Sequence, residues 1–184
     1  MLPILTVVTQ KIEWLATEMK PVYKLAEKYY VRLVKSEAVL ANIRRDDHVL
    51  CIGGGICPFS AILFHQMTGA KVTVIDNCEK CVHKAKKTIA RLGLGDHIHV
   101  WLQDGCSRHI LYADYSVVHL ALQVYPMEQV FSSVVRGITP GTRLLVRQPR
   151  NRAWEGERTF TGLKYKDCVK HTSRNVGSSS LYVK

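Results

Sequence analysis

Three glycines and one aspartate have the spacing that most clearly predicts chemistry in this sequence of 184 residues. Gly53-Gly54-Gly55 follows a short apolar run at 49–52, and Asp76 ends the next apolar run at 71–75. Glycines lack a Cβ atom and therefore let a ligand lie close to the backbone, while the helix that follows offers its positive N-terminus. An acidic side chain 23 positions after Gly53 is suited to accept hydrogen bonds from both hydroxyls of a ribose. This spacing predicts a nucleoside-binding site.

The kind of nucleoside follows from what the loop lacks. The dinucleotide fingerprint requires a third glycine where this chain has Pro58, and a phosphate-binding P-loop requires Gly-Lys-Ser/Thr where it has Pro58-Phe59-Ser60. The residues after the fourth predicted strand do not supply a second mononucleotide-binding half. An adenosine ligand without a pyrophosphate remains, and S-adenosylmethionine fits this description as the predicted cofactor.

Alternating strands and helices must position these loops. Strands are predicted at 49–52, 71–75, 97–102, 115–122 and 142–147, and helices at 22–43, 58–67, 77–92 and 126–136. Continuous apolar strands separated by helices indicate a parallel sheet that is covered on both faces. Residues 163–173 and 180–183 alternate apolar and polar side chains around the Gly/Ser-rich segment 177–180, which predicts a turn there and an antiparallel hairpin. The predicted fold class is α/β, a Rossmann-like sheet of five parallel strands plus a C-terminal antiparallel hairpin, flanked by helices.

The N-terminal region is predicted to be helical. Leu5, Val8, Ile12 and Leu15 recur at helical spacing, and a second helix follows Pro21 until the polar stop at 44–47. Residues 1–45 are therefore expected to form a helical lid over residues 46–184, the ligand-binding domain, within a single compact unit.

Four segments at the loops and strands described above are similar to a known superfamily. They are Val49–Gly55, Val74–Asn77, Gln103–Gly105 and Leu144–Arg147. Through them residues 46–148 resemble the class I S-adenosylmethionine-dependent methyltransferases. The resemblance implies that the glycine loop holds the methionine part of the cofactor, Asp76 the ribose and Asp104 the adenine amino group. The implied cofactor-binding residues are Gly53, Gly54, Gly55, Ile56, Asp76, Asn77, Gln103, Asp104, Gly105 and Leu122. The chain departs from the common pattern at Cys51, where an acidic residue is frequent, and at Cys57, where a glycine is frequent.

A second resemblance concerns one branch of that fold. Gly53–Ser60, Ala113–Leu122 and Val146-Arg147 are similar to the nicotianamine synthases, in which a proline and a Ser/Thr follow the glycines. That family moves the aminocarboxypropyl arm of S-adenosylmethionine and releases methylthioadenosine. Three hypotheses stay open: methyl transfer to a small molecule, aminocarboxypropyl transfer, and a non-catalytic module that binds S-adenosylmethionine or nucleic acid.

Candidates for the acceptor site lie at the carboxyl ends of strands four and five. Gln123 and Tyr125 follow strand four, and Tyr125 is a candidate to orient a substrate amine, although a tyrosine before a helix often only packs. Arg147 ends strand five, where it would bind a substrate carboxylate or form an ion pair. Glu37 is the other candidate general base. Residues 122–126 lack the Asn/Asp-Pro-Pro-aromatic motif of nucleobase amino-methylases, which disfavours base methylation.

The cysteines raise the question of a metal. Cys78 and Cys81 have the CxxC spacing, but a structural zinc site usually needs a second such pair and none is present, so no metal is predicted. Cys57, Cys78 and Cys106 each follow a different strand and are expected near the ligand edge. They are interpreted mainly as small buried residues.

The charge indicates the type of partner. The formal net charge is +11, and residues 149–184 hold eight of the basic and three of the acidic residues. This excess favours an anionic or carboxylate-bearing small-molecule acceptor beside the site, or is only a solvated surface; it does not by itself favour nucleic acid. No run reaches the 18 apolar residues of a membrane span, and a cytoplasmic protein with reduced thiols is expected.

Overall fold

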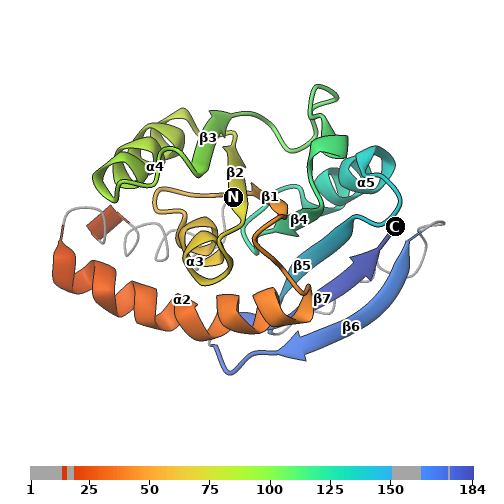
Figure 1. The fold of residues 1–184 in the computed structure, drawn as a ribbon, viewed down its shortest axis with the longest axis horizontal. Coiled ribbons are helices and arrows are strands. Elements are labelled where there is room, and N and C mark those ends of the chain that lie inside the picture. The colour runs from red at the N-terminus through yellow and green to blue at the C-terminus, as the bar shows by residue number, and fades with distance from the viewer. Residues whose placement is uncertain (1–13, 16–18, 151–162, 174) are drawn as a thin grey trace.

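The computed structural model describes residues 14–15, 19–150, 163–173 and 175–184 (Figure 1). The strands are β1 (His48–Ile52), β2 (Lys71–Asp76), β3 (Ile98–Leu102), β4 (Val117–Leu120), β5 (Arg143–Pro149), β6 (Lys164–Lys170) and β7 (Val176–Val183). The helices are α2 (Lys20–Leu40), α3 (Phe59–Thr68), α4 (Glu79–Arg91) and α5 (Met127–Gly137), with a 3₁₀ turn η1 at Tyr112–Asp114. The helix predicted at residues 5–15 lies almost entirely outside the described residues.

The strands form one seven-stranded sheet in the order β3-β2-β1-β4-β5-β7-β6. Strands β1 to β5 are parallel, and β7 runs antiparallel between β5 and β6. The predicted Rossmann-like sheet with a closing hairpin is confirmed. Because the chain order reverses between β1 and β4, the carboxyl ends of these two strands form the crevice where open α/β sheets bind ligands.

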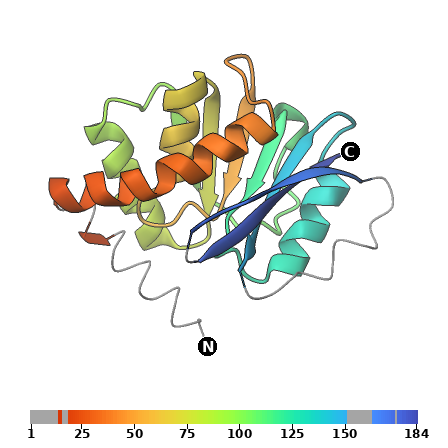
Figure 2. The same ribbon diagram turned by 90° about the horizontal axis from the view of Figure 1, so that it is seen from below.

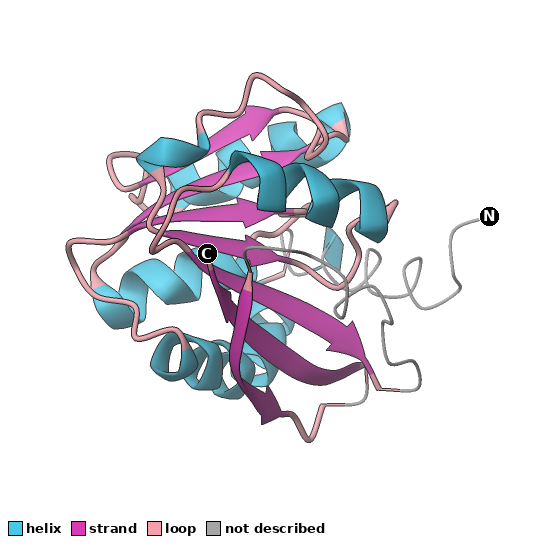
Figure 3. Cartoon of the chain, turned by 90° about the vertical axis from the view of Figure 1, so that its right-hand side faces the viewer, coloured by secondary structure: helices cyan, strands magenta, loops and turns pink. Residues whose placement is uncertain are grey.

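Apolar side chains cover both faces of the sheet, as the continuous apolar strands predict. In β1, Val49 and Cys51 pack with α2, α3 and α4, whereas Leu50 and Ile52 pack with α5. Figure 3 shows the sheet between these two helical layers. The glycine loop therefore leaves a strand that is buried on both sides, which gives the loop a rigid base.

The segment 177–180 forms part of β7 and not the predicted turn. The connection between the hairpin strands comes earlier, between Lys170 and Val176. Ser178 Oγ donates to Gln148 Oε1 at 3.1 Å, and the fully buried Ser179 Oγ donates to Glu37 of α2. A Cβ atom at Gly177 would lie 2.6 Å from the Cα of Arg150. The small residues of this segment thus fit a crowded strand, although their composition is typical of a turn.

Helix α2 crosses one face of the sheet (Figure 2). Its C-terminal half enters the core with Leu33, Val34 and Ala38, all buried in the cluster that α3 also joins. This half is consequently part of the central packing of the fold. The role of residues 1–45 as a lid stays a prediction.

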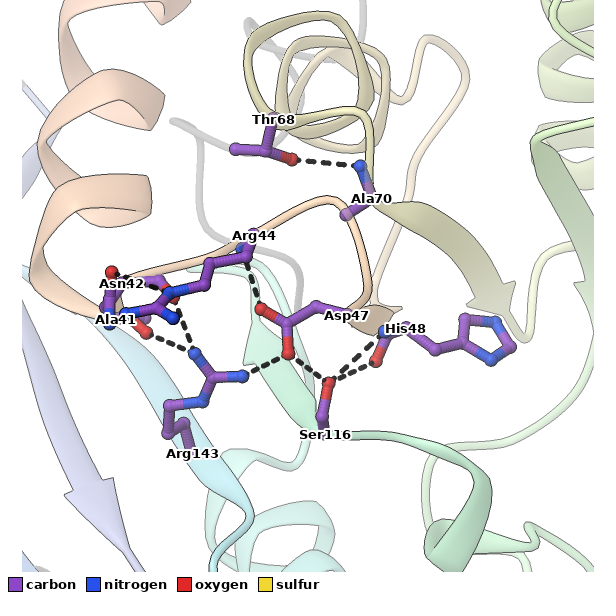
Figure 4. Close-up of polar contacts among 9 residues, drawn as sticks. All are labelled: Ala41, Asn42, Arg44, Asp47, His48, Thr68, Ala70, Ser116 and Arg143. Carbon is purple, nitrogen blue, oxygen red and sulfur yellow. Dashed lines mark hydrogen bonds and ion pairs between the residues drawn. The ribbon is translucent and has the colours of Figure 1, made fainter.

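Asp47 connects several elements at the amino ends of the parallel strands, opposite the ligand crevice (Figure 4). Its carboxylate accepts hydrogen bonds from the Arg44 backbone N–H at 2.7 Å and from Ser116 Oγ at 2.6 Å, and it pairs with the Arg143 guanidinium. Arg143 also donates to the carbonyls of Ala41 and Asn42 at 2.7 Å each. One carboxylate therefore links the end of α2 with β1, β4 and β5.

We expect Asp47→Ala to lower the free energy of unfolding by about 2 kcal/mol near neutral pH, because the half-buried Arg143 and Ser116 donors lose their acceptor. Burial raises the pKa of Asp47, but hydrogen bonds from Ser116 and Arg44 and the charge of Arg143 lower it overall. A lowered folded-state pKa contributes stability above the unfolded pKa of about 4, and this contribution is lost as the pH falls through the folded value. Urea unfolding near pH 7 and near pH 3 should show the difference from wild type shrinking at acid pH. Asp46→Ala, at the exposed neighbour, is the control and should change little.

Candidate functional site

The glycine loop leaves β1 in a conformation that only glycine adopts readily. Gly53 has φ +85°, and its N–H donates to the carbonyl of Ile75 at 2.9 Å. A Cβ atom at Gly54 would lie 2.2 Å from Val74 Cγ1, so the loop presses directly against β2. The chain then turns through Pro58 into α3. The loop and the end of β2 thus form one continuous ledge at the ligand edge.

Asp76 joins the two loops of this ledge. One carboxylate oxygen accepts from the Gly55 N–H at 2.8 Å, and the other accepts from the Cys78 N–H at 2.9 Å. The side chain is half-buried. A carboxylate offers about four acceptor positions in all, so a pair of ribose hydroxyls can still be bound. The position agrees with the ribose-binding role expected for Asp76.

The loop after β3 completes the same edge. The Gln103 N–H donates to the Asp76 carbonyl at 3.0 Å, which places this loop beside Asp76. Gly105 is packed so closely that a Cβ atom there would lie 2.9 Å from both Ile52 and Val130. Asp104, between them, is exposed, and one of its carboxylate oxygens accepts from the Cys106 N–H at 2.7 Å. Asp104 is therefore accessible to a ligand.

The loop after β4 borders the glycine loop. A Cβ atom at Gly53 would lie 2.8 Å from Val124 and 3.4 Å from Ala121, and Leu122 packs on the core beneath. Gln123 is exposed and the Tyr125 side chain is 80% exposed. Tyr125 is thus not the packing residue that the sequence left as an alternative. It stays a candidate for contact with an acceptor.

The N-terminal half of α2 forms a wall beside the glycine loop. Tyr23 and Tyr30 each place a ring centroid 5.1 Å from that of Phe59, the first residue of α3. The Tyr29 hydroxyl is 2.7 Å from Ser173 Oγ, next to the connection between β6 and β7. The signal available in the sequence was three tyrosines on one helix and an aromatic residue directly after the loop.

Tyr23 brings a polar group into this otherwise aromatic wall. Its hydroxyl is buried and has no hydrogen-bond partner among the described residues. Burial, together with the nearby Cys57, raises the pKa of Tyr23. The hydroxyl therefore stays protonated and is a donor available at the edge of the site.

Glu37 and Arg147 form a buried ion pair near the carboxyl end of β5, which corrects the carboxylate-binding role expected for Arg147. Arg147 donates from Nε and a terminal nitrogen to the two Glu37 oxygens at 2.8 and 2.7 Å. Glu37 is fully buried and Arg147 is 5% exposed. Arg147 is consequently engaged with Glu37 and is not presented to a substrate carboxylate, so the ion pair that the sequence left as its alternative is the observed arrangement.

The protonation of this buried group follows from its contacts. Burial raises the pKa of Glu37, but the charge and hydrogen bonds of Arg147, followed by His119, hold it well below its usual range. Burial and the charge of Arg147 lower the pKa of His119, whose Nε2 lies 3.7 Å from Glu37. Burial likewise raises the pKa of Cys51 to about 12. The group is thus an ion pair of Glu37 and Arg147 beside His119, and the role of Glu37 as a general base stays a prediction.

Known structures identify the fold, although no protein-family model matches the sequence and no curated protein sequence matches it. The nicotianamine synthase MtNAS, solved in complex with MTA and tNA, superposes with a TM-score of 0.81 and 24% identity, over 95% of this chain and 69% of its own. An RNA methyltransferase from Salinibacter ruber, solved with S-adenosyl-L-homocysteine, superposes with a TM-score of 0.65 and 18% identity, over 83% of this chain and 89% of its own. This chain has the class I S-adenosylmethionine-dependent methyltransferase fold.

Other class I structures are similar at the same level. A SAM-dependent methyltransferase from Aquifex aeolicus has a TM-score of 0.65 and 15% identity, over 82% of this chain and 89% of its own. The similarity to MtNAS covers the larger share of this chain. None of the helices described here is long and apolar enough to cross a membrane.

Proposed function

We propose that the protein binds S-adenosylmethionine along the carboxyl ends of β1 to β4 and uses it in group transfer to a small molecule. The observation that supports this is the hydrogen-bonded ledge: Gly55 and Cys78 hold the Asp76 carboxylate at the edge of the glycine loop. In the class I fold this is the position that binds the ribose of the cofactor. A Cβ-free loop beside an acidic strand end fits a nucleoside that carries no pyrophosphate.

Each residue of the site would bind the part of the cofactor that lies beside it. Asp76 would bind the ribose hydroxyls, and the exposed Asp104 would accept from the adenine amino group. The backbone of 53–56 would hold the amino-acid end of the cofactor. The cofactor itself supplies an electrophilic carbon next to a sulfonium, so the protein needs mainly to align an acceptor with that carbon. Tyr125, on the loop after β4, and the Tyr23 hydroxyl of the α2 wall would orient such an acceptor.

Aminocarboxypropyl transfer is the reaction that we favour. The structural similarity to MtNAS extends over 95% of the chain, against 83% for the RNA methyltransferase and at a higher TM-score. It also agrees with the proline and serine that follow the glycines at Pro58 and Ser60. Such a transfer would form a bond between the acceptor nitrogen and the aminocarboxypropyl carbon and break the carbon–sulfur bond. Methylthioadenosine would leave with the electron pair of that bond, and the acceptor nitrogen would release a proton to solvent.

Methyl transfer is the second candidate, because two methyltransferases align over 89% of their own chains. Its leaving product is S-adenosylhomocysteine. The acceptor in either case is proposed to be a small amine, and a carboxylate on it would match the positive charge of Lys164, Lys166 and Lys170 on β6.

The nucleoside product distinguishes these reactions. We expect incubation with S-adenosylmethionine and pooled small metabolites to release methylthioadenosine, detected by mass spectrometry against a protein-free control. S-adenosylhomocysteine would instead assign methyl transfer. Binding of S-adenosylmethionine without either product above the control would contradict an enzymatic role with those acceptors.

A further inference from the structure

Three potential metal ligands meet where β2 passes into α4. The Cys78 and Cys81 sulfurs and a carboxylate oxygen of Asp76 lie within 4.8 Å of one another. Among the residues that the structure describes, no other group of three His, Cys, Asp or Glu side chains brings its ligand atoms this close together. No second CxxC pair is present in the sequence, which spoke against a metal, but the third ligand comes from the preceding strand and not from another CxxC.

The backbone holds the two cysteines in a fixed relation. Cys78 is the N-cap of α4, and its sulfur accepts from the Cys81 N–H at 3.4 Å. The Cys78 N–H in turn donates to Asp76. Cys78 and Asp76 are half-buried, whereas Cys81 is 7% exposed, so a cation can enter from the side of Cys78 and Asp76. The site is thus built on the end of β2 and the first turn of α4.

We propose that Asp76, Cys78 and Cys81 bind a borderline-soft divalent cation of the Zn²⁺ type. Two thiolates and one carboxylate are a ligand set that Zn²⁺ accepts, and hard cations such as Mg²⁺ and Ca²⁺ do not favour thiolates. Binding converts two thiols to thiolates and releases two protons, so the affinity falls as the pH is lowered. The N-terminus of α4 favours the resulting negative charge. Three protein ligands leave the fourth tetrahedral position for water or another small ligand.

Because Asp76 belongs to both sites, metal binding should affect binding of the cofactor. This expectation rests on the proposed function. Asp76 is also the residue assigned to the ribose hydroxyls, and its free lone pairs are the ones that a cation would take. Metal and S-adenosylmethionine should therefore weaken each other's binding by the same factor, as linkage requires. The cofactor site would then respond to the availability of thiophilic metal.

The metal alone provides the test. We expect the purified, phosphine-reduced full chain to bind one Zn²⁺ in a calorimetric titration and to show a thiolate-to-metal charge-transfer absorption with Cd²⁺. Cys78→Ser should weaken binding by about 100-fold or more and reduce the Cd²⁺ absorption. Serine is itself a preferred N-cap, so α4 should stay folded in this variant, which thermal unfolding will verify. Cys168→Ser, at an exposed cysteine on β6, is the matched control and should leave the titration unchanged.

Two results would overturn the proposal: absence of stoichiometric Zn²⁺ binding by the wild-type chain, or equal Zn²⁺ affinity in wild type and a folded Cys78→Ser. Neither result depends on S-adenosylmethionine, so a failure of the metal site is separate from a failure of the proposed function. If the cofactor does bind, saturating S-adenosylmethionine should raise the apparent Kd for Zn²⁺ in wild type.

Discussion

Replacing Glu37 by alanine should destabilise the protein by about 3–5 kcal/mol, since the buried Arg147 guanidinium would lose its only carboxylate partner in the described core. Breaking a buried pair by removing one member is costly because the remaining charge is neither solvated nor compensated. Ser179 Oγ would also lose its acceptor. Urea unfolding followed by circular dichroism measures the change, and Glu27→Ala on the same helix is the control, with an expected effect of about 0.5 kcal/mol or less.

The double variant Glu37→Met/Arg147→Met separates the cost of an unpaired charge from the loss of packing. Replacing both members by apolar side chains of similar length removes the buried charges altogether, and such replacements are often neutral or stabilising. We therefore expect the double variant to be more stable than Glu37→Ala. A double variant as unstable as the single one would contradict the assignment of the destabilisation to an uncompensated Arg147.

The strands and the ledge could be predicted because their signals are local. Apolar runs such as 49–52 and 71–75 are continuous in the sequence, and Gly53 and Asp76 lie at their ends. In a parallel sheet the ends of adjacent strands must meet at one edge, so the hydrogen bond between the Gly55 N–H and Asp76 follows from the topology. Local pattern plus topology thus sufficed to predict that the glycine loop and Asp76 meet, and their role in binding a nucleoside stays a prediction.

The polar core could not be predicted, because its partners are far apart in the sequence. Glu37 and Arg147 are separated by 110 positions, and Ser179 is 142 positions from Glu37. A glutamate on a helix and an arginine at a strand end each have an ordinary local environment in the sequence, and only the packing of α2 on the sheet brings them together. The same packing buries Ser179. The segment 177–180 is consequently part of a strand, although its composition is typical of a turn.

Replacing Asp76 by alanine should weaken S-adenosylmethionine binding by about 100-fold, which corresponds to the loss of one to two charge-assisted hydrogen bonds to the ribose. Isothermal titration calorimetry on the folded variant measures the change. Asp96→Ala, at an exposed aspartate outside the predicted site, is the control and should bind as wild type does. Unaltered affinity in Asp76→Ala would contradict the assignment of the ribose contact.

Asp76 also accepts from the Gly55 and Cys78 N–H groups, so the variant could lose affinity because the ledge has shifted and not because a ligand contact is gone. A cycle with an S-adenosylmethionine analogue that lacks a ribose hydroxyl distinguishes the two causes. If Asp76 contacts the ribose directly, removing the hydroxyl weakens binding to wild type but has little further effect on Asp76→Ala. If Asp76 acts only by holding the loops, the missing hydroxyl costs both proteins equally. We expect the first result, because the carboxylate has acceptor capacity beyond the two backbone hydrogen bonds and lies half-buried at the edge where the nucleoside must enter.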